Sequence, residues 1–256
     1  MKPIRMAGAL LFAITISLGA AGPVSGQTAI GRVGFEIEGG PVWQGSNDVE
    51  IPNDGTATRF SLSDLAGSGP YASYRFYLSY APGERHRLRL LLAPFSIEES
   101  GISPLPIRFE NREFAGGEPL RAKYRFSSYR LTYSYRLHAG ERWLFDLGFT
   151  AKIRDAEVAL SQNGRSASNS NVGFVPLIHV RTQVPVSTPF SIVLDADFLA
   201  APQGRAEDIS LKLRYSLSDL WYAAAGYRML EGGADVDDVY TFAWLHYAVL
   251  SFGREF

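Results

Sequence analysis

The sequence predicts an all-β fold: a transmembrane antiparallel β-barrel of about ten strands that follow one another in an up-and-down meander. Three observations predict it. Ten segments alternate apolar residues with polar or small ones, charged residues occupy the polar positions of these segments, and the connections between segments are mostly short and long in turn. Because successive side chains of a strand point to opposite faces, such segments have one face suited to lipid and one suited to water.

Residues 1–26 precede the predicted barrel and have the features of a secretory signal peptide. Lys2 and Arg5 come first, an apolar run from Met6 to Ala21 follows, and residues 24–26 are the expected cleavage site. The alternative is a membrane-anchoring helix, which needs about 20 apolar residues, more than this run supplies. We therefore expect an exported protein whose mature domain, residues 27–256, is the barrel.

Composition limits the chemistry of the mature chain. Without its first 26 residues it has 23 basic and 26 acidic residues, a formal charge of −3 that argues against a nucleic-acid partner. The chain has no cysteine, which excludes disulfides, thiolate zinc sites and Cys-ligated haem. Asp235, Asp237 and Asp238 lack the Gly and Glu spacing of a calcium loop and indicate a solvated turn. We expect no cofactor and no metal.

Ten segments have the alternation of a membrane-crossing strand. The more apolar positions, such as Tyr74, Phe76 and Leu78, are assigned to lipid, and the intervening positions to the interior. Strands are expected near 31–43, 71–80, 86–98, 123–137, 143–160, 172–184, 190–200, 208–217, 221–230 and 239–255. Eight or twelve strands are the alternatives, twelve if residues 99–122 form a full hairpin. Pro104 and Pro106 interrupt the apolar pieces there, which favours ten.

The connections predict which end of the barrel holds the termini. They are short after the even-numbered strands, at 81–85, 138–142, 185–189 and 218–220. After the odd-numbered strands they are mostly longer and rich in Gly, Ser, Asn, Asp and Pro, at about 44–70, 99–122, 161–171, 201–207 and 231–238. An even number of strands then leaves both termini at the end with the short turns.

The last segment, residues 240–256, has the most specific pattern. Apolar residues recur at alternate positions through Leu250 and Phe252, and the sequence ends on Phe256. In this it resembles the bacterial outer-membrane β-barrel proteins, although Arg254 departs from the pattern, at a place where its side chain can snorkel to the interface. The resemblance implies location in the outer membrane of a Gram-negative bacterium and contact with its lipid and lipopolysaccharide. It also implies assembly by the barrel-assembly machinery, which would read Phe256, Phe252 and Leu250.

Aromatic residues at lipid-facing positions flank the short connections. Trp and Tyr prefer the boundary between membrane and water, so this set predicts an aromatic girdle at that end of the barrel. Its members are Tyr80, Tyr135, Trp143, Tyr215 and Trp221.

The predicted interior is strongly charged. Apart from His179, it has eleven basic and five acidic residues: Glu36, Glu38, Arg75, Arg87, Arg89, Arg130, Arg136, Asp146, Lys152, Arg154, Arg181, Asp195, Asp197, Lys212, Arg214 and Arg228. Unpaired charges are prohibitively costly in the core of a soluble sandwich, whereas a membrane barrel has a polar interior. A barrel with few strands is narrow, which favours a salt-bridged lattice that fills the lumen. The alternative is a narrow solute channel with anion preference, because the excess cations cluster near the short connections.

No catalytic motif can be transferred to this chain. His86 and His138 adjoin short turns, His179 faces inward, and His246 lies at a lipid-facing position in mid-strand. Acyl transfer needs a nucleophile beside a base, and no Ser has the matching position on the strand of His246. Asp195 and Asp197 are expected to lack the Asp–His companion of the omptin proteases. We therefore expect a non-catalytic, monomeric structural or surface-interaction barrel, with an anion channel as the alternative and a hydrolase third.

Overall fold

The computed structural model describes residues 32–140 and 142–255, so the expected signal peptide and Phe256 lie outside the described residues. The predicted all-β fold and the ten-stranded meander are confirmed. The barrel strands are β1 (Arg32–Glu50), β3 (Tyr71–Ala81), β4 (His86–Ala93) with its continuation β5 (Ser96–Ile102), β8 (Pro119–Ala139), β9 (Leu144–Gln162), β10 (Arg165–Ser187), β11 (Phe190–Ala201), β12 (Gly204–Ser216), β13 (Trp221–Val236) and β14 (Val239–Glu255). We count β4 and β5 as one interrupted strand, because both pair with β8.

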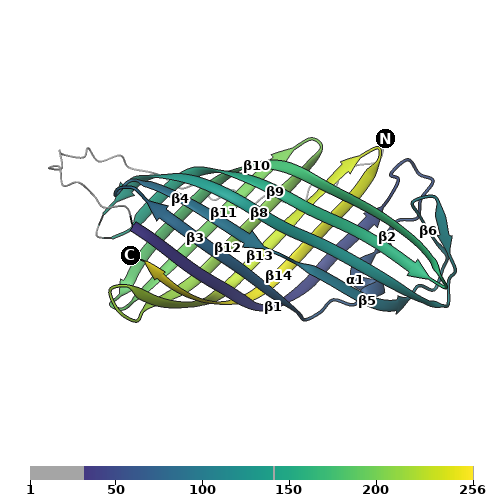
Figure 1. The fold of residues 1–256 in the computed structure, drawn as a ribbon, viewed down its shortest axis with the longest axis horizontal. Helices are drawn as coiled ribbons and strands as arrows, with labels where there is room; N and C mark the ends of the chain where they lie inside the picture. The colour runs from purple at the N-terminus through teal and green to yellow at the C-terminus, as the bar shows by residue number, and fades with distance from the viewer. Residues whose placement is uncertain (1–31, 141, 256) are drawn as a thin grey trace.

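The sheet closes on itself, as Figure 1 shows. Each strand is antiparallel to its neighbours, and β14 pairs with β1 from Gly34↔Glu255 to Glu50↔Tyr240. We call the end of the barrel with Arg32, Glu255 and the connections that follow β3, β8, β10 and β12 the turn end. The opposite end, at the right of Figure 1, is the loop end. No helix among the described residues is long and apolar enough to span a membrane.

Polar and apolar residues are placed in the reverse of their usual order in water-soluble proteins. On the outer face Leu78, Leu131 and Phe149 are 52%, 53% and 49% exposed, whereas the inward-facing Arg130 and Lys152 are each 3% exposed. Water-soluble proteins rarely expose so many large apolar side chains. Their exposure here therefore marks a surface that another apolar phase covers.

Three connections at the loop end are tight turns, and the expectation of longer loops there was wrong. Asn163 and Gly164 join β9 to β10, both with positive φ (51° and 78°), the conformation of a two-residue hairpin turn. Residues 202–203 and 237–238 make the other two turns. The flanking residues on the outer face of β10 are small and polar, yet they continue the strand because they stay paired with β9, as in Ser166↔Ser161.

The two remaining loops fold into the loop end of the barrel. The first carries β2 (Phe60–Ser61) and the short helix α1 (Leu62–Ala66), and the second, between β5 and β8, carries a hairpin of β6 (Ile107–Phe109) and β7 (Arg112–Phe114). This hairpin forms a sheet of its own, so the barrel keeps ten strands and not twelve.

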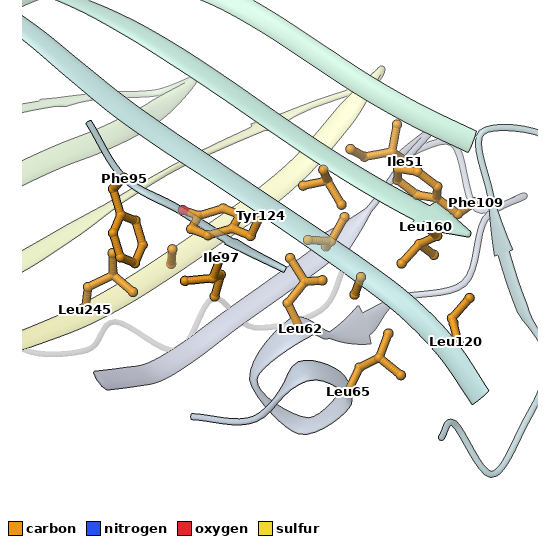
Figure 2. Packing of buried hydrophobic residues seen from close by; sticks show 14 of the residues in the cluster. Ile51, Leu62, Leu65, Phe95, Ile97, Phe109, Leu120, Tyr124, Leu160 and Leu245 are labelled. Atoms are coloured by element: carbon orange, nitrogen blue, oxygen red, sulfur yellow. The ribbon is translucent and has the colours of Figure 1, made fainter. Parts of the chain in front are cut away.

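Side chains from both loops and from the barrel wall meet in one buried apolar cluster, which we call the plug (Figure 2). Its members include Ile51, Leu62, Leu65, Phe95, Ile97, Phe109, Leu120, Tyr124, Leu160 and Leu245. Burying a large apolar side chain contributes roughly 1.5–3 kcal/mol, so the plug is a stable core. It closes the loop end of the lumen.

Candidate functional site

The inward charges meet in a lattice whose first centre is formed by Glu38 and Asp208. Arg228 donates its Nε to Glu38 Oε1 at 2.9 Å and also pairs with Asp208. Arg75 Nη2 and Arg130 Nη2 reach Asp208 Oδ2 at 2.7 and 2.6 Å. All five side chains are less than 7% exposed. Because they come from β1, β3, β8, β12 and β13, their ion pairs cross the lumen.

A second centre lies around Asp195 and Asp197. Arg89 binds Asp195 with two hydrogen bonds of 2.5 and 3.0 Å, and Arg130 Nη1 donates to Asp197 Oδ2 at 2.8 Å. His179 Nδ1 lies 2.8 Å from Asp197 Oδ1. His179 stands directly opposite Asp197 in the β10–β11 register, so one buried histidine accompanies this aspartate inside the lumen.

Strand adjacency indicates some lattice partners and not others. Arg75 lies 3.7 Å from Glu38 and Arg181 lies 3.9 Å from Asp195, each across neighbouring strands, but the partners of Lys212 are different. Lys212 Nζ reaches Glu36 Oε1 at 2.5 Å and Glu38 Oε2 at 2.9 Å, whereas Asp195, on the neighbouring strand, pairs with Arg89. Sequence reasoning also missed two acidic members, Asp208 and Glu255. The signal for Asp208 was available, since it has the same inward parity on β12 as Lys212.

The turn end holds a vestibule of about 710 Å³. Arg136 Nε binds Asp146 at 2.8 Å, and Arg214 Nη2 binds Glu255 at 3.1 Å. Arg87 lies 3.8 Å from Glu255 and Arg181 lies 3.9 Å from Asp146, so four guanidinium groups share two carboxylates. A second, smaller cavity of about 40 Å³ lies between the vestibule and the lattice, and its lining includes Asp195, Lys212 and Arg228.

The remaining predicted residues lie in the barrel wall nearer the loop end, or on the outer face of the barrel. Lys152 and Arg154 line a separate cavity between β10 and β11. Leu250 and Phe252 are 68% and 46% exposed on the outside of β14. His246, the polar residue at a lipid-facing position, has its Nδ1 2.5 Å from Tyr227 Oη on β13, so its ring has a hydrogen-bond partner.

The predicted girdle residues surround the turn end. Tyr80 and Tyr215 are 44% and 41% exposed on the outer face. Tyr135 packs edge-on against His86, Trp143 stacks on His138 with ring centroids 4.4 Å apart, and Trp221 stacks on Phe252 at 4.9 Å. Paired rings of this kind hold a fixed orientation.

No family model matches the sequence, and no curated protein matches it. Among solved structures, the outer-membrane protease OmpT from Escherichia coli is similar with a TM-score of 0.52 at 8% identity, over 88% of this chain and 97% of that one. Ail, the attachment invasion locus protein of Yersinia pestis, has a TM-score of 0.40 at 13% identity, over 88% and 99%. Neisserial surface protein A has 0.32 at 11%, over 86% and 95%. At these identities the similarity to OmpT shows the fold alone.

Proposed function

Because this chain has the closed barrel fold of a bacterial outer-membrane β-barrel protein, we propose that it is an integral outer-membrane protein that neither conducts solutes nor catalyses a reaction. Its role is to present a rigid surface at the loop end to lipopolysaccharide and external partners. The observation that carries this proposal is that the lumen is closed twice. The ion pairs of the lattice fill its middle and the plug fills its loop end.

The lengths of the strands support the inference that the loop end of the barrel projects beyond the membrane. A tilted β-strand crosses a bilayer with about 9–11 residues. The strands β8, β9 and β10 have 21, 19 and 23 residues. The exposed large apolar side chains of β8 and β9 lie in their turn-end half, and those of β10 begin at Val172, so the loop-end residues of all three strands extend outside, where external molecules can reach them.

A basic group lies on the outer face of this extension. Arg121, Lys123 and Arg125 follow each other at alternate positions of β8, beyond the exposed Tyr129. Their partners are Glu98, Glu157 and Asp155, in pairs that are open to water at Arg121 and partly exposed at Lys123 and Arg125. Such pairs contribute little stability, so the phosphates of lipopolysaccharide can compete for the cations.

We expect the double variant Lys123→Gln/Arg125→Gln to bind lipopolysaccharide about tenfold more weakly than the wild type, since charge-assisted hydrogen bonds to phosphate contribute about 1.5–3 kcal/mol. Titration of purified lipopolysaccharide into the protein in non-ionic detergent measures this. Arg165→Gln, at the tip of the β9–β10 hairpin, is the matched control. Equal affinity of the double variant and the wild type would contradict a role for this group.

The alternative function is an anion channel, which would pass current in a planar bilayer, whereas a closed lumen would not. We expect the wild type to show no openings. Replacing residues 103–117 by a short Gly-Ser linker removes part of the plug, and we expect this variant to remain closed because the lattice is intact. Openings with anion selectivity in the wild type would support the channel and refute a closed lumen.

A hydrolase is the third candidate, and the His179–Asp197 pair is the arrangement that raises it. Both side chains are at most 4% exposed, and Asp197 already accepts hydrogen bonds from Thr150 and Arg130. A general base must reach its substrate, and these groups are instead engaged in the lattice. Their arrangement therefore supports a structural role.

A further inference from the structure

The barrel wall is interrupted between β10 and β11. These strands pair from Ser187↔Phe190 up to Ile178↔Phe198. Beyond that point β10 pairs only with β9, as in Leu177↔Thr150, while β11 turns away into β12 after Ala201. Pro176 of β10 has no N–H to donate across the interruption. The result is a lateral notch in the wall, between the upper part of β10 and the end of β11.

A cavity of about 260 Å³ occupies this notch. Its apolar lining includes Phe126, Phe174, Val175, Pro176 and Leu199. Phe174 is 61% exposed and stands opposite Ile153, which is 41% exposed on the same outer face. The notch therefore opens sideways at the loop-end border of the lipid-facing side chains, with Gln203 of the β11–β12 turn and Gly204 of β12 at its rim.

Two cations line the inner side of the cavity. Lys152 is only 3% exposed, and its Nζ lies 5.0 Å from the centroid of the Phe126 ring. Within residues 32–140 and 142–255 it has no hydrogen bond and no ion pair. Arg154 Nη2 donates to Asn171 Oδ1 at 2.7 Å, whereas its Nε has no acceptor in the same part of the chain.

The uncompensated charge distinguishes this cavity from the lattice. Arg75, Arg130, Arg228 and Lys212 each bind carboxylates, and Arg205, which lines the same notch, pairs with Glu231. Burying a cation without a counter-charge costs free energy, and an anion that enters the notch recovers it. The apolar lining and the lateral opening require that anion to carry an apolar chain.

We propose that the notch binds a single-chain amphiphilic carboxylate, that is, a long-chain fatty acid. The carboxylate meets Lys152 and Arg154, and the alkyl chain runs along Phe174, Pro176 and Leu199 into the surrounding lipid. Guanidinium and ammonium donors form short, charge-assisted hydrogen bonds with a carboxylate. The proposal rests on the membrane placement proposed above, because only that placement puts lipid at the mouth of the notch.

Equilibrium binding of radiolabelled palmitate to the protein in lipid nanodiscs tests this, with empty nanodiscs as the blank. We expect saturable binding to the wild type, competition by unlabelled palmitate, and little competition by hexadecanol, which lacks the charge. Lys152→Met should weaken binding about tenfold, the effect of one charge-assisted hydrogen bond. Leu199→Trp, which fills the notch and leaves both cations in place, should also abolish saturable binding.

Two further measurements separate binding from folding. Lys152→Met should raise the urea midpoint of unfolding while it weakens palmitate binding, because it removes an uncompensated buried charge. Arg165→Gln, at an exposed cation at the tip of the β9–β10 hairpin and outside this cavity, should leave the affinity unchanged. Unaltered palmitate affinity in Lys152→Met, or equal competition by hexadecanol, would overturn the proposal.

Liposome flotation tests the membrane placement separately. A wild-type protein that fails to float refutes the proposed function, and one that floats without saturable palmitate binding refutes only the fatty-acid site. Saturable binding of radiolabelled lipopolysaccharide that Lys152→Met weakens, together with no palmitate binding, would assign the notch to a lipid phosphate and would refute the carboxylate.

Discussion

Replacing Arg228 with methionine is expected to lower the free energy of unfolding by about 3–5 kcal/mol, the usual effect of removing one partner of a buried ion pair. Arg228 binds Glu38 from β1 and Asp208 from β12, and it donates to Tyr77 Oη at 3.0 Å. Without it, two carboxylates lose a counter-charge in the closed lumen. Urea unfolding in detergent micelles, followed by tryptophan fluorescence and by migration of unheated samples on a gel, measures the loss.

Arg205→Met is the matched control for this experiment. Arg205 also pairs with a carboxylate, Glu231, but the two side chains are 45% and 22% exposed. Surface pairs contribute at most about 1 kcal/mol, so this variant should unfold almost as the wild type does. Similar losses in Arg228→Met and Arg205→Met would show that the lattice does not stabilise the barrel.

Replacing Phe109 with alanine is expected to destabilise the plug by about 3–5 kcal/mol, as truncation of a buried aromatic residue does. Phe109 is fully buried and packs edge-on against Phe60, with ring centroids 6.0 Å apart. The β6–β7 hairpin should then leave the plug, and its backbone should become free enough for trypsin to cleave at Arg108 and Arg112, whose side chains are already exposed. A time course of limited digestion, read by mass spectrometry, should show rapid cleavage after these residues.

The barrel itself should tolerate this change. Its strands are held by their own pairing and by the lattice, so we expect the urea midpoint of Phe109→Ala to stay close to that of the wild type. Leu105→Ala is the control, since Leu105 is 71% exposed and should affect neither measurement. A midpoint that falls together with the protease resistance would mean that plug and barrel unfold as one unit.

The barrel could be predicted from the sequence because the two-residue alternation directly reports the two faces of a strand. Every expected strand corresponds to an observed one. The partners of the inward charges could not be predicted in the same way. Lys212 meets Glu36 across a separation of 176 residues, and such contacts depend on strand tilt and stagger, which no short segment encodes.

The loop end was harder to predict for two physical reasons. Beyond the apolar band the outer face of a strand meets water, so Ser166, Ser168 and Ser170 replace apolar residues there and no alternation marks this part of β10. The apolar pieces of loop two are short, and their burial depends on Leu62 and Leu65 arriving from loop one. The notch also had no sequence signal, since it arises from the unequal lengths of neighbouring hairpins.

The seam between β1 and β14 has a consequence for the order in which the protein can assemble. The first described strand receives its second neighbour only from the last one, and Glu38 of β1 acquires Lys212 and Arg228 only when the chain curls round to it. A nascent polypeptide that stops before β14 would have an unpaired strand edge on β1. Its Glu38 would also lack the cations Lys212 and Arg228, which ring closure brings to it. Completion of the ring is therefore a late, all-or-none event, and a partly translated product should be recognisable to quality-control proteases by that exposed edge.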